Sequence, residues 1–287
     1  MQYHTATSYE NAVELAEAAQ GTIRFLAGGT DVLVQLRAEI VTPDVLIDIK
    51  QIPGAADIQC LADGSWQIGS AVSGAQLDEH SALKANWPGV VEAMNLIGST
   101  QVQGRATLTG NLCNGSPAAD SVPAMLAANA SVTIIGPDGQ RQVPVKDIPS
   151  GPGKTTLKSG EVIASVNLPA QSASGADAYL RFIPRTEMDI AVVGCAVSLE
   201  LDGAKIAKAR VAIGAVAPTV RLVESAAEGL IGSTLDDAAL AALASAVRAA
   251  CDPINDKRGT IEYRTHVAGV LAQRAAKIAY QRARSKS

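Results

Sequence analysis

The sequence has 287 residues, which is enough for two domains or for one subdivided domain with a sizeable core. Hydrophobic residues make up 47% of it and aromatic residues only 3%, so we expect a largely aliphatic, alanine-rich core. The formal net charge of −4 gives no reason to expect binding to nucleic acid or to an anionic membrane.

Membrane-spanning and metal-binding classes also lack support in the sequence. No apolar run approaches the roughly 18 residues that a membrane span needs. The N-terminus has neither the basic nor the apolar region of a signal peptide, so we expect a cytoplasmic protein with reduced thiols. The cysteines are far apart and form no Cys-x-x-Cys pair, a spacing that predicts neither a zinc site nor an iron–sulfur cluster.

The first 57 residues are expected to form a small α/β unit. Ser8 can cap a helix whose apolar residues recur at helical spacing, and strands are predicted at 23–27 and 45–50. A second helix is expected to start near Val32, between the two strands. This alternation of helices and strands is typical of an α/β unit.

A glycine pair follows the first predicted strand. Gly28 and Gly29 precede Thr30 and Asp31, either of which can cap the next helix. A turn of this kind exposes backbone N–H groups and the positive end of a helix dipole, which together suit a phosphate group. The pattern fits an ordinary strand-to-helix turn equally well, so these residues alone leave both interpretations open.

Residues 58–172 have the pattern of a second, β-rich unit. The predicted elements are hairpins at 58–68 and 131–145, a strand at 162–168, and helices at 86–97 and 121–129. Ser73 and Gln76 have the spacing of a capping box, which predicts the start of another short helix. Residues 101–120 show little periodicity and many small polar side chains, and they are predicted to form a long loop.

A linker of small and polar residues at 170–176 precedes the last part of the chain. The predicted elements beyond it are strands at 179–183, 191–201 and 206–213 and helices at 219–230, 235–250 and 260–284. The sequence therefore predicts an α+β protein with units at 1–57, 58–172 and 177–287.

Several common nucleotide-binding and hydrolase motifs do not occur. There is no Gly-x-Gly-x-x-Gly, which argues against a Rossmann dinucleotide site. Gly151-Pro-Gly-Lys-Thr155 resembles a P-loop, but the first glycine of that motif would fall at Ile148, so we interpret the segment as a surface turn. Neither a Gly-x-Ser-x-Gly elbow nor a His-Glu-x-x-His helix is present.

Residues 105–120 are the second informative stretch. Their small residues would let a bulky ligand approach the backbone, and Thr107, Asn111, Ser116 and Asp120 could supply directional polar contacts. The alternative is a solvated loop held by Asx-type turns. Because long loops within a compact domain are uncommon unless they bind something, we favour a binding role.

Two separated motifs carry a resemblance to a known family. One is Ala27-Gly-Gly-Thr-Asp31, and the other is Thr107-Leu-Thr-Gly-Asn111 followed by Ser116-Pro-Ala-Ala-Asp120. They resemble the FAD-binding medium subunit of the molybdenum hydroxylases, which include carbon monoxide dehydrogenase, xanthine dehydrogenase, and nicotinate and quinoline oxidoreductases. The resemblance covers essentially the whole chain, including segments at 160–169, 185–193 and 256–264.

The resemblance implies a fold and a set of cofactor contacts. The fold is a two-part FAD-binding domain of the vanillyl-alcohol-oxidase (PCMH) type, followed by a small domain of three antiparallel strands and three helices. The implied FAD-binding residues are Ala27, Gly28, Gly29, Thr30, Asp31, Val32, Thr107, Gly110, Asn111, Asp120, Ile163 and Arg181. The segment from Ala27 to Asp31 would wrap the pyrophosphate, Ile163 would contact the adenine or flavin edge, and Arg181 would lie beside the isoalloxazine. Thr107, Gly110, Asn111 and Asp120 would hold the diphosphate, ribityl or ring portions.

The chain also departs from the family pattern. Relatives usually carry Arg-Asn-Arg-Gly-Thr-Ile-Gly-Gly-Asn where this chain has Gln103-Gly-Arg-Ala-Thr-Leu-Thr-Gly-Asn111. Gly104 and Thr109 are therefore unusual, and Thr109 in place of a glycine narrows the room for close approach to the backbone. The branch of the family with an extra iron–sulfur cluster in this subunit is excluded, because the cysteines for that cluster are missing.

The resemblance further implies the flavoprotein subunit of a heterotrimeric molybdenum hydroxylase, in a dimer of heterotrimers. Molybdopterin would be on a large subunit and two [2Fe–2S] clusters on a small subunit. Electrons would pass from these clusters to FAD on this chain and then to NAD⁺, a quinone, dioxygen or a carrier protein. No side chain of this chain is assigned as an acid, a base or a nucleophile. The alternatives are a self-sufficient FAD-dependent oxidoreductase and a flavin-free assembly subunit.

Overall fold

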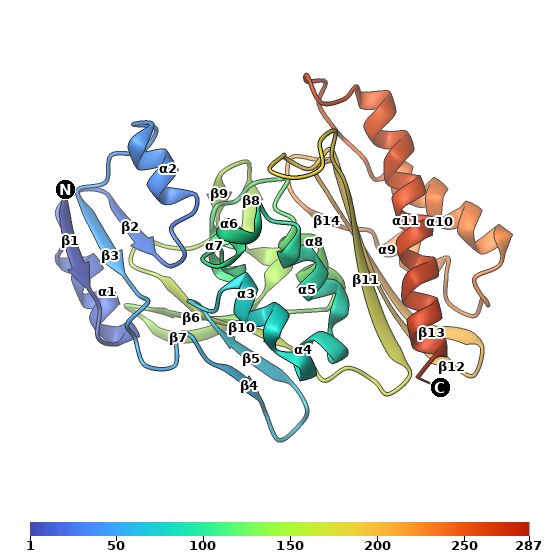
Figure 1. The fold of residues 1–287 in the computed structure, drawn as a ribbon, viewed down its shortest axis with the longest axis horizontal. Coiled ribbons are helices and arrows are strands. Elements are labelled where there is room, and N and C mark those ends of the chain that lie inside the picture. The colour runs from blue at the N-terminus through green and yellow to red at the C-terminus, as the bar shows by residue number, and fades with distance from the viewer. Residues whose placement is uncertain (287) are drawn as a thin grey trace.

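The computed structural model describes residues 1–286, and it places three larger sheets side by side from the N-terminus to the C-terminus (Figure 1). A fourth, two-stranded sheet pairs β8 (Pro149–Gly151) with β9 (Lys154–Thr155). The first sheet has parallel strands in the order β1-β3-β2, and α1 packs against β3. The elements of this unit are β1 (Gln2–Thr5), α1 (Tyr9–Ala18), β2 (Ile23–Leu26), α2 (Val32–Arg37) and β3 (Val45–Asp48). The cap predicted for α1 is confirmed, because the Ser8 hydroxyl accepts a hydrogen bond from the backbone of Asn11 (3.0 Å).

The second sheet is antiparallel, with strands in the order β4-β5-β10-β6-β7, and both predicted hairpins are confirmed. Its elements are β4 (Ile58–Cys60), β5 (Trp66–Gly69), α3 (Gly74–Glu79), α4 (Ser81–Asn86), α5 (Pro88–Asn95), α6 (Thr100–Gln103), α7 (Leu108–Cys113), α8 (Ser121–Ala127), β6 (Ser131–Gly136), β7 (Gly139–Pro144), the 3-10 helix η1 (Val145–Asp147), β8 (Pro149–Gly151), β9 (Lys154–Thr155) and β10 (Val162–Leu168). Ile68 and Val166 of the strands share a buried core with Leu112 and Met125 of the helices. Burial of this aliphatic surface holds the helices on the sheet.

The long loop predicted for 101–120 is wrong, because most of α6 and all of α7 lie within it. Both helices are too short for an apolar period to be visible in the sequence. The Thr107 hydroxyl accepts a hydrogen bond from the backbone of Gly110 (2.9 Å) and so caps α7. Leu108 and Leu112 are buried, so tertiary packing stabilises a helix that has little intrinsic preference to form.

The predicted capping box at the start of α3 is confirmed. The backbone of Gln76 donates to the Ser73 hydroxyl (3.3 Å), and the Gln76 side chain accepts from the backbone of Ser73 (2.9 Å). We expect Ser73→Ala to lower the free energy of unfolding by about 1 kcal/mol, because it removes the cap of a buried helix end. Urea unfolding followed by circular dichroism would measure the change. A midpoint equal to that of the wild type would show that the cap contributes nothing.

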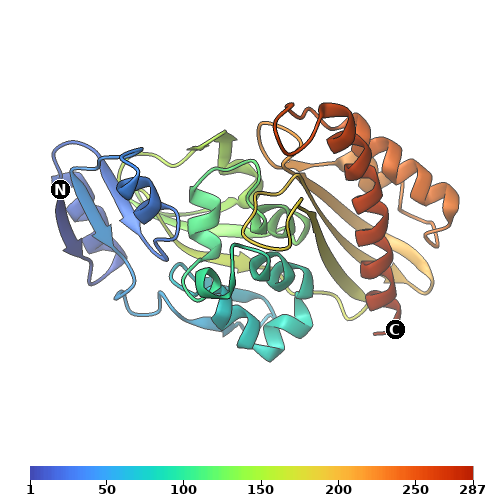
Figure 2. The same ribbon diagram turned by 45° about the horizontal axis from the view of Figure 1, so that its top comes forward.

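The third sheet is antiparallel in the order β11-β12-β13-β14. Its unit contains β11 (Gly175–Phe182), β12 (Val193–Asp202), β13 (Lys205–Gly214), β14 (Arg221–Leu222), α9 (Glu224–Glu228), α10 (Asp237–Ala249) and α11 (Ile261–Arg284). The long helix α11 runs along this sheet (Figure 2), whereas α5 and α8 of the second unit also contact it. No helix within residues 1–286 is long and apolar enough to cross a membrane.

Ser287, the final residue of the predicted last unit, lies outside the described residues. Two predictions for the rest of this unit need correction. The linker predicted at 170–176 ends earlier, because β11 begins at Gly175 and pairs there with Glu200. Its last two residues, Gly175 and Ala176, are instead the buried start of a strand. The helix predicted at 219–230 is shorter, because 221–222 forms the edge strand β14 and α9 begins at Glu224.

Candidate functional site

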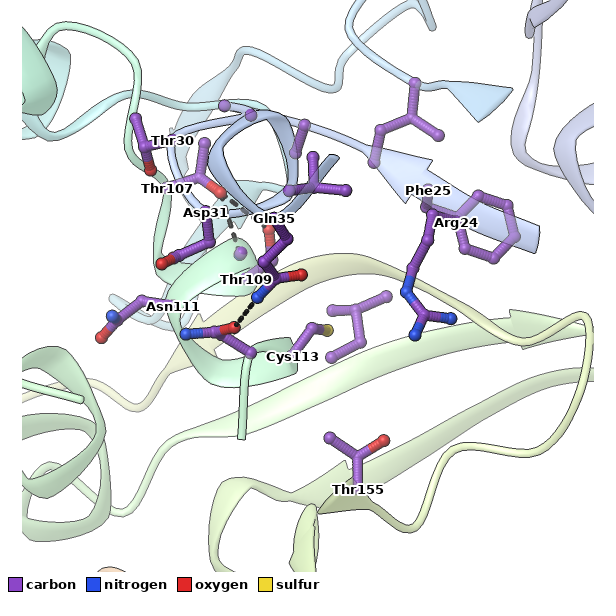
Figure 3. A pocket seen from close by; sticks show the side chains of 18 of the residues that line it. Arg24, Phe25, Thr30, Asp31, Gln35, Thr107, Thr109, Asn111, Cys113 and Thr155 are labelled. Carbon is purple, nitrogen blue, oxygen red and sulfur yellow. Dashed lines mark hydrogen bonds between the residues drawn. The ribbon is translucent and has the colours of Figure 1, made fainter. Parts of the chain in front are cut away.

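A cavity of about 530 Å³ lies where the first and second units meet. One wall comes from β2, the turn after it and α2, and the other comes from α7, β9 and β10. Figure 3 shows that Thr30 and Asp31 of the first wall lie near Thr107 and Asn111 of the second wall towards one end of the cavity, with Arg24 and Phe25 towards the other end. The volume lies within the range of about 300–1,000 Å³ that is typical of sites for small molecules and cofactors.

Glycine is required at positions 28 and 29, after β2, for two different structural reasons. A Cβ atom on Gly28 would lie 1.9 Å from the backbone oxygen of Arg105, so a side chain at this position cannot coexist with the present contact between the two units. Gly29 has a φ of +78°, a conformation that side chains disfavour. Gly28 therefore lets the two walls of the cavity meet, and Gly29 lets the chain turn into α2.

The turn offers unpaired backbone donors to the cavity. In the range 1–286, the N–H groups from Gly28 to Asp31 donate no hydrogen bond to the protein. The predicted side-chain cap of α2 is wrong, because Asp31 has a helical backbone conformation and makes no capping hydrogen bond. These free N–H groups, and not the dipole of a six-residue helix, are the feature that suits a phosphate group.

The two carboxylates in the cavity wall differ in their partners. Glu161 accepts two hydrogen bonds from Arg141 (3.0 and 2.8 Å), which hold the pKa of the Glu161 carboxyl below its usual value. The Asp31 side chain accepts no hydrogen bond from the described part of the chain, and desolvation raises its pKa. Asp31 thus leaves an acceptor available for a ligand.

The opposite wall is held in place by Asn111. Its side-chain oxygen accepts hydrogen bonds from the backbone (3.2 Å) and the hydroxyl (2.7 Å) of Ser121, the first residue of α8. With that oxygen engaged, the amide nitrogen of Asn111 is left to donate to a ligand. Asn111 therefore joins the cavity wall to the next helix and still offers N–H groups.

The cavity contains several residues that the sequence did not single out. Arg24 lines it and forms no ion pair within the described residues; its guanidinium donates only to the neighbouring oxygen of Ile23 (3.0 Å). Gln35 on α2 donates to Asn114, just after α7 (3.2 Å), and thereby joins the two walls. The alternation of exposed and buried residues around Arg24 is typical of any half-exposed strand, so only its place in the strand that leads into the glycine motif could have indicated a role.

The predicted site residues fall into two groups. Those that line the cavity are Ala27, Gly28, Gly29, Thr30, Asp31, Val32, Thr107, Gly110, Asn111 and Ile163. Asp120 and Arg181 do not line it and instead form a buried ion pair (2.7 Å) between α8 and β11, to which the Tyr179 hydroxyl also donates (2.8 Å). Burial raises the pKa of Asp120 to about 6 even though Arg181 opposes the shift.

The fold and this cavity together define a class of cofactor-binding protein. Residues 1–171 match the family described as the FAD binding domain in molybdopterin dehydrogenase, and residues 178–279 match the CO dehydrogenase flavoprotein C-terminal domain. The carbon monoxide dehydrogenase medium chain of Hydrogenophaga pseudoflava is 32% identical over 98% of this chain and 97% of its own length. The xanthine dehydrogenase FAD-binding subunit of Escherichia coli O157:H7 is 32% identical over 95% of this chain and 93% of its own length.

Solved structures show the same relationship. A chain of the carbon monoxide dehydrogenase from Hydrogenophaga pseudoflava that lacks the Mo-pyranopterin moiety superimposes with a TM-score of 0.94 at 32% identity, over 98% of both chains. The protein belongs to this family: it is a medium, FAD-binding subunit of the carbon monoxide dehydrogenase and xanthine dehydrogenase type of molybdenum hydroxylase. The chain is therefore an oxidoreductase subunit. The resemblance to this family that the two motifs indicated is confirmed.

Proposed function

We propose that this chain carries FAD in the cavity between its first two units and transfers electrons through it. In this proposal, FAD receives electrons from [2Fe–2S] clusters on a small subunit, which take them from molybdopterin on a large subunit. An external acceptor then removes the electrons. The observation that supports the proposal most is the cavity itself, because both family motifs line it from opposite sides.

The residues present fit the elongated, charged shape of FAD. The free backbone N–H groups from Gly28 to Thr30 suit the diphosphate, and the unpaired guanidinium of Arg24 supplies the positive charge. Ile163 is buried and contributes an apolar edge for a ring. Asp120 and Arg181 are proposed to act indirectly, by holding α8 against the third sheet while Asn111 joins α8 to the cavity wall.

When bound, FAD supplies the redox chemistry, and the protein orients it and limits access to it. Two candidate nucleophiles in the lining are not activated: Glu161 is paired with Arg141, and the Cys113 thiol, although exposed on the cavity wall, is desolvated by the surrounding protein, which raises its pKa to about 12. Because the flavin itself supplies the redox chemistry, the proposal assigns no acid, base or nucleophile to this chain. Its task is binding and positioning.

The state of Cys113 gives a testable expectation for how FAD is held. A thiol with a pKa near 12 stays protonated at neutral pH, so we expect the flavin to be bound without a covalent link. Denaturation in acid or detergent should release all the yellow colour, and the protein band should show no flavin fluorescence in a denaturing gel. Fluorescence that stays with the chain would contradict this expectation.

Purification of the native complex by a tag on this chain would test the proposed function. We expect two further chains to co-purify, together with molybdenum, iron and the visible spectrum of flavin and iron–sulfur clusters, at the mass of a dimer of heterotrimers. Isolation of a single, active, iron-free chain would instead identify a self-sufficient FAD-dependent oxidoreductase. A complex without flavin, which gains none when FAD is added, would identify an assembly subunit.

A further inference from the structure

The hairpin of β8 and β9 contains the segment Gly151-Pro-Gly-Lys-Thr155, which its pattern predicted to be a surface turn. Part of this hairpin also lines the cavity: Gly153 and Thr155 contribute to the wall, whereas Lys154 between them does not. This alternation is that of a strand, in which successive side chains point to opposite sides. The segment therefore belongs to the cavity wall, although it lacks the pattern of a P-loop.

A close contact with the end of α7 holds the hairpin at the cavity. The N–H of Gly153 donates to the backbone oxygen of Gly115 (2.9 Å), and a Cβ atom on Gly115 would lie 2.7 Å from the backbone nitrogen of Lys154. Gly115 also has a φ of +64°, a conformation that side chains disfavour. At the base of the hairpin, the Thr156 hydroxyl donates to the backbone oxygen of Asp147 (2.7 Å). The position of the hairpin at the cavity is therefore fixed by contacts within the second unit.

The Thr155 hydroxyl has no hydrogen-bond partner in the described part of the chain. Its side chain is half-buried and lines the cavity, and Figure 3 shows it pointing from β9 into the interior. By contrast, the hydroxyls of Thr107 and Thr109 are both engaged with protein groups. Thr155 therefore keeps both a donor and an acceptor for a ligand.

Arg24 reaches into the cavity from the opposite wall, away from Thr30 and Asp31 (Figure 3). Its guanidinium forms no ion pair with the described residues, so it can donate to a ligand. Polar groups that reach in from two walls suit a ribose and its phosphate, which carry oxygen atoms in several directions, better than the flat isoalloxazine. Leu157 lines the same cavity and adds an apolar contact for the adenine ring.

We propose that the β8–β9 hairpin is part of the FAD site and that Thr155 binds the adenosine half of the cofactor, across the cavity from Arg24. This inference rests on the proposed function and refines it. The Thr155 hydroxyl donates to an oxygen of the adenosine ribose or of the adjoining phosphate. Thr155 is thus a binding residue that takes no part in the redox chemistry.

Titration of the full-length apoprotein with FAD, and with ADP as a competitor, tests this assignment. Thr155→Val removes the hydroxyl at similar volume, and we expect the Kd for FAD to rise about fivefold, the effect of one neutral hydrogen bond. Because ADP carries the adenosine half without the flavin, its inhibition constant should rise by the same factor. Thr155→Ser keeps the hydroxyl and should bind both ligands as the wild type does.

Gly115→Ala tests the position of the hairpin by a second route. The new Cβ atom should push the hairpin away from α7 and weaken the binding of FAD and ADP at least as much as Thr155→Val does. Thermal unfolding of each apoprotein reports any general loss of structure.

Three results would overturn the inference. One is unchanged FAD binding by Thr155→Val, and another is an equal loss in Thr155→Ser, which would show that the hydroxyl is not the cause. The third is a loss for FAD without a loss for ADP, or the failure of ADP to compete with FAD in the wild type, because another part of the cofactor would then lie at Thr155. Failure of the wild type to bind FAD would instead overturn the proposed function.

Discussion

Gly28→Ala is expected to abolish or strongly weaken FAD binding, with a Kd at least about tenfold higher than that of the wild type. The new Cβ atom would lie 1.9 Å from the oxygen and 2.7 Å from the carbonyl carbon of Arg105, so the two walls of the cavity must move apart. Both atoms belong to the backbone and cannot rotate away. FAD content after purification and titration of the apoprotein would measure the loss.

Gly104→Ala provides the matched control for this variant. Gly104 has a φ of −63°, and a Cβ atom there would lie 3.6 Å from the nearest neighbouring atom, which is an ordinary contact. Alanine should therefore leave FAD binding unchanged and slightly increase stability by restricting the unfolded chain. Equal FAD affinity for Gly28→Ala and Gly104→Ala would contradict the role assigned to the glycine turn.

The stability of the protein is expected to fall as the pH rises from 6 to 8, because of Asp177 at the start of β11. Burial raises the pKa of the Asp177 carboxyl to about 7, helped by the charge of Glu92, whereas the N–H of Gly89 and the charges of Arg282 and Lys286 oppose the shift. One of its carboxylate oxygens has no hydrogen-bond partner in the described chain.

The direction of this pH dependence follows from the raised pKa of the Asp177 carboxyl. The folded state binds a proton at pH values where the unfolded state, with a pKa near 4, does not, so protonation stabilises the fold. This stabilisation is fully present below pH 4 and is lost as the pH rises through 7. For one such group, the free energy of unfolding should be on the order of 1 kcal/mol lower at pH 8 than at pH 6.

Asp177→Asn should remove most of this pH dependence, as measured by urea unfolding at the two pH values. The buried Asp120, with a pKa near 6, is already about half ionised at pH 6 and contributes a smaller change of the same sign, which should remain in Asp177→Asn. Wild type and Asp177→Asn with the same dependence between pH 6 and 8 would show that another group is responsible. The test compares how stability changes with pH and not its value at a single pH. The new amide N–H group of Asp177→Asn also needs a hydrogen-bond partner, and this alone can lower the stability at both pH values.

The main elements of the fold could be predicted from the sequence where a local signal was strong. The turn residues of the hairpins and the caps Ser8 and Ser73 each fix a short stretch of backbone, and those predictions are confirmed. The helices α6 and α7 could not be predicted, because burial of Leu108 and Leu112 stabilises them and burial is a property of the whole fold.

The candidate site, like the fold, could be predicted only in part from the sequence. The two motifs predicted residues on opposite walls, but the contact between Gly28 and Arg105 appears only once the units meet in space. The pairing of Asp120 with Arg181 joins residues far apart in the chain, so the sequence offered no signal that each is the partner of the other. Thr109, a departure from the family pattern, is accommodated because its hydroxyl faces Ser70.

Titration of the full-length apoprotein with FAD tests the central claim most directly. The account predicts saturation at about one molecule of FAD per chain in the wild type and in Gly104→Ala, with a marked loss of affinity in Gly28→Ala. A wild-type chain that binds no FAD, or Gly28→Ala that binds it as tightly as the wild type, would contradict a flavin site between the two units.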